Sequence, residues 1–171
     1  MSTPVVAIRA LSQYVGQSVT LQGWLYNRRS SKKLVFLEVR DGTGVVQAIV
    51  SLQDIGAEPF AAADRLAQET ALRVTGEVKA HPKHADTYEL AVTAFEVVGA
   101  CAGEYPISPK EHGTDFLMDH RHLWLRSRRQ AAILRVRAEI VRAIRDYFDD
   151  NGFTLVDAPI FTPNACEGTS T

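Results

Sequence analysis

Residues 34–47, with the sequence LVFLEVRDGTGVVQ, constrain the fold most because every second residue in their first half is aliphatic. The aliphatic set consists of Val35, Leu37 and Val39. Successive side chains of a strand point to opposite faces, so this set should face a core and Phe36 should lie outside, between Glu38 and Arg40. A ring held there among charges is suited to stacking on a nucleic-acid base. The alternative interpretation is a lone exposed phenylalanine under a neighbouring loop.

The order of the predicted elements indicates the fold of the first 100 residues. Residues 41–44 form a turn signal between two strand-like runs, which therefore pair as a hairpin, and Gly23 could mark a bulge or bend. The expected strands are residues 20–29, 34–40, 45–51, 71–79 and 88–98, with a helix at 59–68. Three strands, a helix and two strands predict a mainly β fold with some α, a five-stranded OB-fold barrel over residues 1–100.

The second part of the chain has a different character. Residues 101–128 contain Pro106 and Pro109, mixed charge and a small apolar group, which is typical of a hinge or linker. Residues 129–150 have a helical apolar period, Gly152 favours a helix end, and residues 153–156 favour a strand. A helix and one strand cannot bury a core of their own. We therefore expect residues 129–171 to be the truncated start of another domain.

Composition excludes several classes of protein. The formal net charge of −1 gives no overall basic field, although eight arginines lie between residues 121 and 145, an arrangement also typical of a solvated helix face. The two cysteines are far apart, which suits a reducing cytoplasm and predicts no disulfide framework. No signal peptide and no apolar run long enough to span a bilayer occur, so we expect no membrane partner.

Sites for metal or nucleophilic chemistry are weakly indicated. His112, His120 and His122 lack a nearby cysteine or carboxylate constellation, so we expect no metal site. Cys166 has no histidine within reach in the sequence that could activate its thiol. No glycine-rich phosphate loop appears.

Polar residues on the expected strands could bind RNA beside Phe36. Gln47 has an amide suited to the edge of an unpaired base, and Glu89 could accept hydrogen bonds from base amino or imino groups. Arg28 and Arg29 end the first strand, where one or both could meet phosphates. Each of these polar residues alone could instead be a solvent-exposed side chain without a binding role. The prediction of RNA binding therefore depends on their convergence on one face of the barrel.

Several short motifs together resemble a known family. Gly23-Trp24, Arg28-Arg29, Phe36, Arg40-Asp41, Gly44 and Gln47 are similar to the anticodon-binding barrel of class IIb aminoacyl-tRNA synthetases, the aspartyl, asparaginyl and lysyl enzymes. The helix of residues 129–150, followed by Gly152-Phe153 and Pro159, resembles their motif 1. Residues 111–126 and 165–170 look most like bacterial asparaginyl members.

The resemblance implies a role for each matching residue. Phe36 and Gln47 would stack on and read the central uridine of the anticodon, Glu89 would contact another anticodon base, and Arg29 would contact the anticodon loop. Lys79 and His81 stand where aspartyl members have arginines, which leaves their tRNA-binding role open. In motif 1, Gly152, Phe153 and Pro159 would belong to a homodimer interface. Glu167 matches a glutamate that contacts the amino group of the amino-acid substrate.

The resemblance also implies the activity of an intact enzyme. It would join asparagine to its tRNA through an adenylate, using ATP and Mg²⁺. The family's motif 2 and motif 3 arginines and magnesium-binding acids have no counterpart in these 171 residues. We therefore expect this polypeptide to have no catalytic residues, to bind neither cofactor and to be inactive alone. An aspartyl enzyme with relaxed tRNA choice and a stand-alone OB-fold RNA-binding module remain alternatives.

Overall fold

A computed structural model describes residues 3–108 and 110–160 of the chain. The chain divides into two compact units, residues 1–111 and 112–171. The boundary falls inside residues 101–128, which the sequence predicts to be a linker. Residues 101–111 of this linker group with the first unit. Each unit is described by itself.

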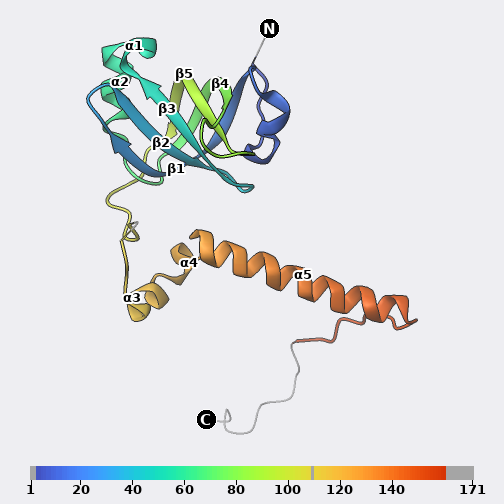
Figure 1. The fold of residues 1–171 in the computed structure, drawn as a ribbon. Coiled ribbons are helices and arrows are strands. Elements are labelled where there is room, and N and C mark those ends of the chain that lie inside the picture. The colour runs from blue at the N-terminus through green and yellow to red at the C-terminus, as the bar shows by residue number, and fades with distance from the viewer. Residues whose placement is uncertain (1–2, 109, 161–171) are drawn as a thin grey trace. The chain divides into compact units, whose positions relative to one another are not determined.

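The first unit is built around the predicted five-stranded barrel (Figure 1). Its strands are β1 (Ser18–Ser30), β2 (Leu34–Arg40), β3 (Val45–Ser51), β4 (Ala71–Ala80) and β5 (Tyr88–Gly99). They close in the order β1-β2-β3-β5-β4, and all neighbours are antiparallel except β3 and β5. Closure leaves no long strand edge without a partner, which protects such a sheet from pairing with other chains.

Strand alternation fills the barrel as the sequence predicts. Strand β2 buries Val35, Leu37 and Val39 completely, and β3 buries alternate residues from Val46 to Val50. Side chains from the other strands and Leu11 complete one hydrophobic core. Removal of this apolar surface from water is the main force that stabilises the barrel.

Two glycines permit close approach of neighbouring strands. A Cβ atom on Gly76 of β4 would lie 2.2 Å from the carbonyl oxygen of Ala91, and one on Gly23 of β1 would lie 2.3 Å from that of Arg40. Neither distance is compatible with a side chain. Gly23 therefore marks a close backbone contact, whereas the bulge of β1 lies between Leu25 and Asn27.

A 3₁₀ helix that the sequence did not reveal, η1 (Ile8–Tyr14), is fastened to the turn between β2 and β3. The Asp41 carboxylate accepts the backbone N–H of Ile8 at 2.8 Å, and its other oxygen accepts the N–H groups of Thr43 and Gly44 at 2.6 and 2.9 Å. Burial alone raises the pKa of Asp41, but these bonds and one from the Thr43 hydroxyl outweigh burial and lower it.

The predicted helix between the third and fourth strands is present but shorter and displaced. It comprises α1 (Leu52–Ile55) and α2 (Ala57–Ala63), so the expected end at residue 68 is wrong. Beyond Ala63, the Asp64 side chain accepts hydrogen bonds from β1, and Glu69 has a φ of 63°, which is not helical. Leu66 still packs on the core after the helix has ended.

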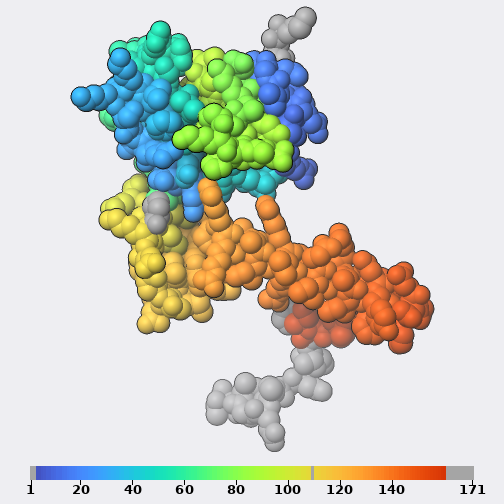
Figure 2. All heavy atoms as spheres, in the orientation of Figure 1, coloured from blue at the N-terminus to red at the C-terminus, as the bar shows by residue number. Residues whose placement is uncertain are grey.

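The second unit consists of α3 (Thr114–Asp119), α4 (Arg121–Trp124) and α5 (Arg128–Asp150). Helix α5 ends at Asp150, and the predicted stop at Gly152 forms a Schellman motif: Phe153 N–H donates to the Phe148 carbonyl and Gly152 N–H to that of Asp149, each at 3.1 Å. The predicted strand at residues 153–156 does not form, because no described segment pairs with it. Figure 2 shows the side chains along α5, and none of the residues of this helix is buried.

In residues 3–108 and 110–160, no helix is both long and apolar enough to cross a membrane.

We expect replacement of Gly76 by alanine to open the barrel between β4 and β5. The new methyl group would meet the Ala91 carbonyl oxygen, and separation of the two strands would cost several hydrogen bonds, about 2 kcal/mol or more of the free energy of unfolding. Gly42→Ala is the matched control, since a Cβ there meets nothing within 4 Å. Urea denaturation should separate the two variants, and equal midpoints would contradict the proposed close packing.

The pKa of Asp41 predicts how acid weakens the barrel. Because the folded pKa is lowered, Asp41 contributes stability above its unfolded pKa of about 3.9 and loses this contribution as the pH falls through the lower folded value. Asp41→Asn should therefore be less stable than the wild-type chain at neutral pH, with a difference that shrinks below about pH 4. Denaturation at several pH values measures this, and a difference independent of pH would contradict it.

Candidate nucleic-acid interface

The outer face of the barrel brings the predicted RNA-binding residues into two adjacent rows. In one row, Arg29 of β1 pairs with Phe36 of β2, which pairs in turn with Ile49 of β3. The next row contains Gln47 of β3, Glu89 of β5 and Lys79 of β4 as successive register partners. Residues far apart in the sequence thus share one surface, as the sequence analysis expected.

The bulge in β1 decides which arginine reaches this surface. Strict alternation from buried Leu25 would turn Arg28 outward, but the bulge adds one residue before Asn27 and reverses the faces. Arg28 consequently pairs with inward-facing Leu37, and Arg29 pairs with outward-facing Phe36. Only Arg29 joins the candidate interface.

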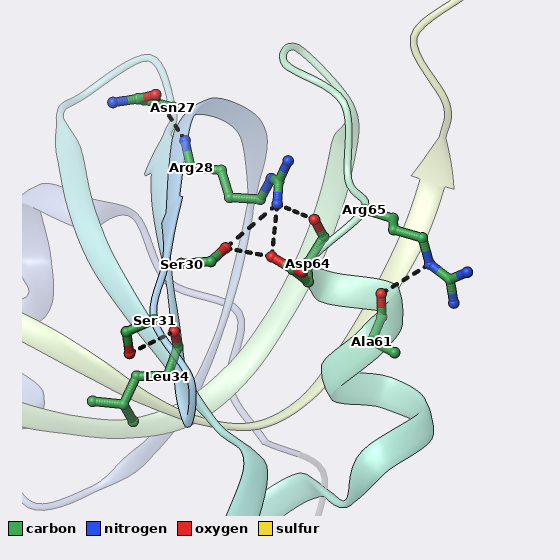
Figure 3. Close-up of polar contacts among 8 residues, drawn as sticks. All are labelled: Asn27, Arg28, Ser30, Ser31, Leu34, Ala61, Asp64 and Arg65. Atoms are coloured by element: carbon green, nitrogen blue, oxygen red, sulfur yellow. Dashed lines mark hydrogen bonds and ion pairs between the residues drawn. The ribbon is translucent and has the colours of Figure 1, made fainter.

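Arg28 is instead tied to the end of α2, as Figure 3 shows. Its guanidinium donates to the Asp64 carboxylate at 2.8 Å and also to the Asp64 carbonyl oxygen. The Ser30 hydroxyl donates to the same carboxylate. Arg28 therefore connects β1 to the end of α2. The sequence predicts that one or both arginines meet phosphates, and only Arg29 lies on the candidate interface.

Arg29 contacts the two residues predicted to recognise a base. Its guanidinium carbon lies 4.8 Å from the centroid of the half-buried Phe36 ring, within the range of a cation–π contact. Its Nη2 donates to Gln47 Oε1 at 2.6 Å. The planar guanidinium thus stacks on the ring and holds the amide at the same time.

Gln47 and Glu89 form the polar centre of the surface. Gln47 Nε2 donates to Glu89 Oε1 at 2.7 Å, so the amide has a carboxylate on one side and Arg29 on the other. These two partners determine which way the amide points, because its oxygen must face the donor and its nitrogen the acceptor. One lone pair on Oε1 and one hydrogen on Nε2 remain for a ligand.

The remaining predicted contacts differ in availability. Lys79 is half exposed, and its ammonium lies 3.8 Å from Glu77, which leaves it able to meet a phosphate. His81, in the turn after β4, uses both ring nitrogens within the protein, since Nδ1 accepts from the turn backbone and Nε2 lies 3.5 Å from Glu89. These contacts place His81 beside Glu89, and its role in tRNA binding stays a prediction.

The structure adds Ile49 to the residues expected from the sequence. It is the β3 partner of Phe36 and lies half-buried on the outer face, where it extends the apolar floor beside the ring. The signal for it was the alternation of β3, in which Ala48 and Val50 are buried and Ile49 falls between them.

The other predicted site residues lie in or beyond the second unit. The Phe148 and Phe153 rings meet edge to face with centroids 5.4 Å apart, and Gly152 has a φ of 82°. Pro159 is exposed. Glu167 and Cys166 lie outside the described residues. Within residues 3–108 and 110–160, no group of three or more His, Cys, Asp or Glu side chains could hold a metal ion.

Taken together, the outer surface offers an aromatic ring, a cation and an oriented amide and carboxylate side by side on neighbouring strands. A ring binds the face of a base, an amide and a carboxylate bind its edge, and cations bind phosphates. This combination is typical of proteins that recognise single-stranded RNA.

Comparison with known proteins gives the same division of the chain. Residues 19–98 match the family model of the OB-fold nucleic acid binding domain. Residues 113–171 match that of the class II tRNA synthetases (D, K and N). The two matches flank the boundary between the structural units.

Individual relatives agree with these models. An asparagine–tRNA ligase of Sorangium cellulosum is 68% identical over 98% of this chain, and one of Desulforamulus reducens is 56% identical over 96%. The chain spans only 38% of the length of each relative. The crystal structure of asparaginyl-tRNA synthetase from Pyrococcus horikoshii complexed with asparaginyl-adenylate superimposes with a TM-score of 0.82 at 34% identity, covering 97% of this chain and 39% of that one. The chain is therefore similar to the class II (D, K and N) tRNA synthetases in both of its regions, the OB-fold nucleic acid binding domain at residues 19–98 and the synthetase region at residues 113–171.

Proposed function

We propose that the chain is the anticodon-binding portion, with motif 1, of an asparagine–tRNA ligase. The relatives that share half or more of their aligned residues with it have that name. The observation that carries the proposal is the outer face of the barrel, where Phe36, Gln47 and Glu89 converge beside Arg29. The partner bound there is the anticodon loop of an asparagine tRNA.

The geometry of Phe36 and Gln47 supports recognition of the central uridine by these two residues. The base stacks on the Phe36 ring and thereby gains affinity that does not depend on its identity. The free lone pair of Gln47 Oε1 accepts from uracil N3–H, and the free N–H of Nε2 donates to a uracil carbonyl oxygen. Because Arg29 and Glu89 already orient the amide, little freedom is lost when the base binds.

Glu89 supplies an acceptor for a second base. Its carboxylate has only 12% of its side-chain surface exposed, and Oε1 is occupied by Gln47. Oε2 has no partner among the residues that the structure describes. An accessible carboxylate oxygen without a donor favours a ligand that brings an N–H group, such as a base edge.

We further propose that helix α5 mediates homodimer formation. Its exposed apolar residues recur at helical spacing and would be covered by a second copy of the chain. They are Ile133, Val136, Ile140, Ile144 and Tyr147. Phe153 continues this surface beyond Gly152, and Pro159 follows it.

The parent enzyme would act in the cytoplasm, whose reducing conditions suit the free thiol of Cys101. It would use ATP and Mg²⁺ to activate asparagine. The described residues do not fit a magnesium site, since they contain no suitable acidic cluster. We propose that a polypeptide of these 171 residues binds RNA but does not activate the amino acid, so ATP–pyrophosphate exchange should stay at background.

Replacement of Phe36 by alanine should weaken binding of the asparagine anticodon stem-loop by about 1–3 kcal/mol, because the stacked base loses its platform. Phe36→Tyr keeps the ring and should bind within about twofold of the wild-type chain. Fluorescence anisotropy with a labelled RNA hairpin measures both. Equal losses in the two variants would show that the effect is not stacking.

Gln47 can be tested by changing the RNA instead. Replacing the central anticodon uridine by adenosine should reduce the affinity of the wild-type chain by about 1–3 kcal/mol but hardly affect Gln47→Ala, which no longer reads that edge. A uridine replaced in the stem is the control and should affect neither protein. If both proteins tolerate the anticodon change equally, Gln47 does not read the base.

The two neighbouring arginines should have different effects when changed. Arg29→Ala should lower the affinity for the hairpin by about 1 kcal/mol, and Arg29→Lys should restore little, since an ammonium cannot stack on Phe36 and hold Gln47 together. Arg28→Ala should leave RNA affinity unchanged and lower thermal stability slightly, because Arg28 forms an ion pair with Asp64. A larger loss of affinity in Arg28→Ala than in Arg29→Ala would contradict the assignment.

A further inference from the structure

His81 is held in one orientation by the turn that follows β4. Its backbone N–H donates to the Thr87 carbonyl at 2.8 Å. Its ring Nδ1 accepts the backbone N–H groups of Lys83 and His84 at 3.1 and 3.2 Å. The His84 ring lies against it, with centroids 4.7 Å apart. The histidine thus closes its own turn through one ring nitrogen.

This arrangement specifies the tautomer of the neutral ring. Since Nδ1 accepts two hydrogen bonds, it has no hydrogen, and the ring hydrogen must be on Nε2. Nε2 lies 3.5 Å from Glu89 Oε1, and the two side chains are only 22% and 12% exposed. The turn therefore directs an N–H group at the carboxylate, although the separation is long for a strong hydrogen bond.

Glu89 Oε1 then faces two N–H groups, from His81 and from Gln47. The two nearest cations bind elsewhere, since Lys79 lies beside Glu77 and Arg29 donates to Gln47. Both donors attract the same oxygen. This fixes the carboxylate rotation and leaves Oε2 as the oxygen available to a ligand.

We propose that His81 is a positioning residue for base recognition, which presents Glu89 Oε2 to a base with N–H donors on its edge. The inference rests on the proposed function of the same surface. His81 itself does not contact RNA; it acts through Glu89. The nucleotide recognised is the anticodon base beside the central uridine, and guanine is the base with adjacent N–H donors on its Watson–Crick edge.

Two substitutions separate the effect of His81 Nδ1 from that of Nε2. His81→Asn retains a short acceptor that can close the turn, as asparagine does in Asx turns, but it removes the N–H directed at Glu89. His81→Gln places an amide N–H near the position of Nε2 but gives up the acceptor of the turn. A purely structural histidine would be replaced better by asparagine, and a positioning histidine better by glutamine.

The test measures binding of the asparagine anticodon stem-loop to the 171-residue chain by fluorescence anisotropy, with thermal melting in parallel. His81→Asn should melt close to the wild-type chain and bind about fivefold more weakly. His81→Gln should melt lower and bind more tightly than His81→Asn. In a Glu89→Gln background, His81→Asn should have no further effect on affinity, because its target has changed.

The results can overturn the inference in distinct ways. His81 does not act through Glu89 if His81→Asn binds the hairpin with wild-type affinity. The same conclusion holds if His81→Asn reduces the affinity as much in the Glu89→Gln variant as in the wild-type chain. If the wild-type chain does not distinguish hairpins with and without the central uridine, the proposed function and the role of His81 fail together. If the wild-type chain distinguishes these hairpins but His81→Asn binds the hairpin as tightly as the wild-type chain, only the role of His81 is overturned.

Discussion

The parallel pairing of β3 with β5 is the contact on which the candidate interface depends. It places Gln47 beside Glu89, which are separated by 42 residues in the chain, and it completes the ring of strands. On its other side β5 lies close to β4, and Gly76 allows this approach because it has no side chain. The same closure that buries the aliphatic core therefore also assembles the polar outer face.

The polar residues of that face bind each other in the free protein. Arg29, Gln47, Glu89 and His81 form a continuous series of contacts from the Phe36 ring to the β4–β5 turn. Each group keeps unused bonding capacity while its orientation is set by its neighbours. A ligand therefore meets groups that are already aimed, which reduces the entropy lost on binding. Arg29 lies over part of the Phe36 ring, so we expect the base to stack on the part of the ring that the guanidinium leaves exposed.

Much of this could be predicted from the sequence because it depends on local pattern. Alternation in residues 34–51 indicated the hairpin, its buried side and the outward position of Phe36, and Gly152 indicated the end of α5. The remainder depends on contacts between distant residues. A bulge in β1 exchanges the roles of Arg28 and Arg29, and Asp64, 36 residues away, then binds Arg28. Neither the position of a bulge nor such a partner follows from alternation.

The errors have a similar origin. Residues 59–68 have helical spacing, but α2 ends at Ala63 because the next residues are held by β1 and by a left-handed turn at Glu69. Residues 153–156 have strand propensity, but a strand exists only where another strand pairs with it. The tRNA-binding role predicted for His81 is not among these errors: its ring nitrogens are directed at its own turn and at Glu89, and we propose that it affects RNA binding through Glu89.

The central claim is that one unpaired uridine lies on the outer face of β2 and β3. Photo-crosslinking tests it most directly, with an anticodon hairpin that contains 4-thiouridine at the central position, followed by mass spectrometry of the linked peptides. The account predicts crosslinks to peptides that include Phe36 or Gln47, with none when the modified base is moved into the stem. Crosslinks confined to α5, or equal yields from the two RNAs, would contradict it.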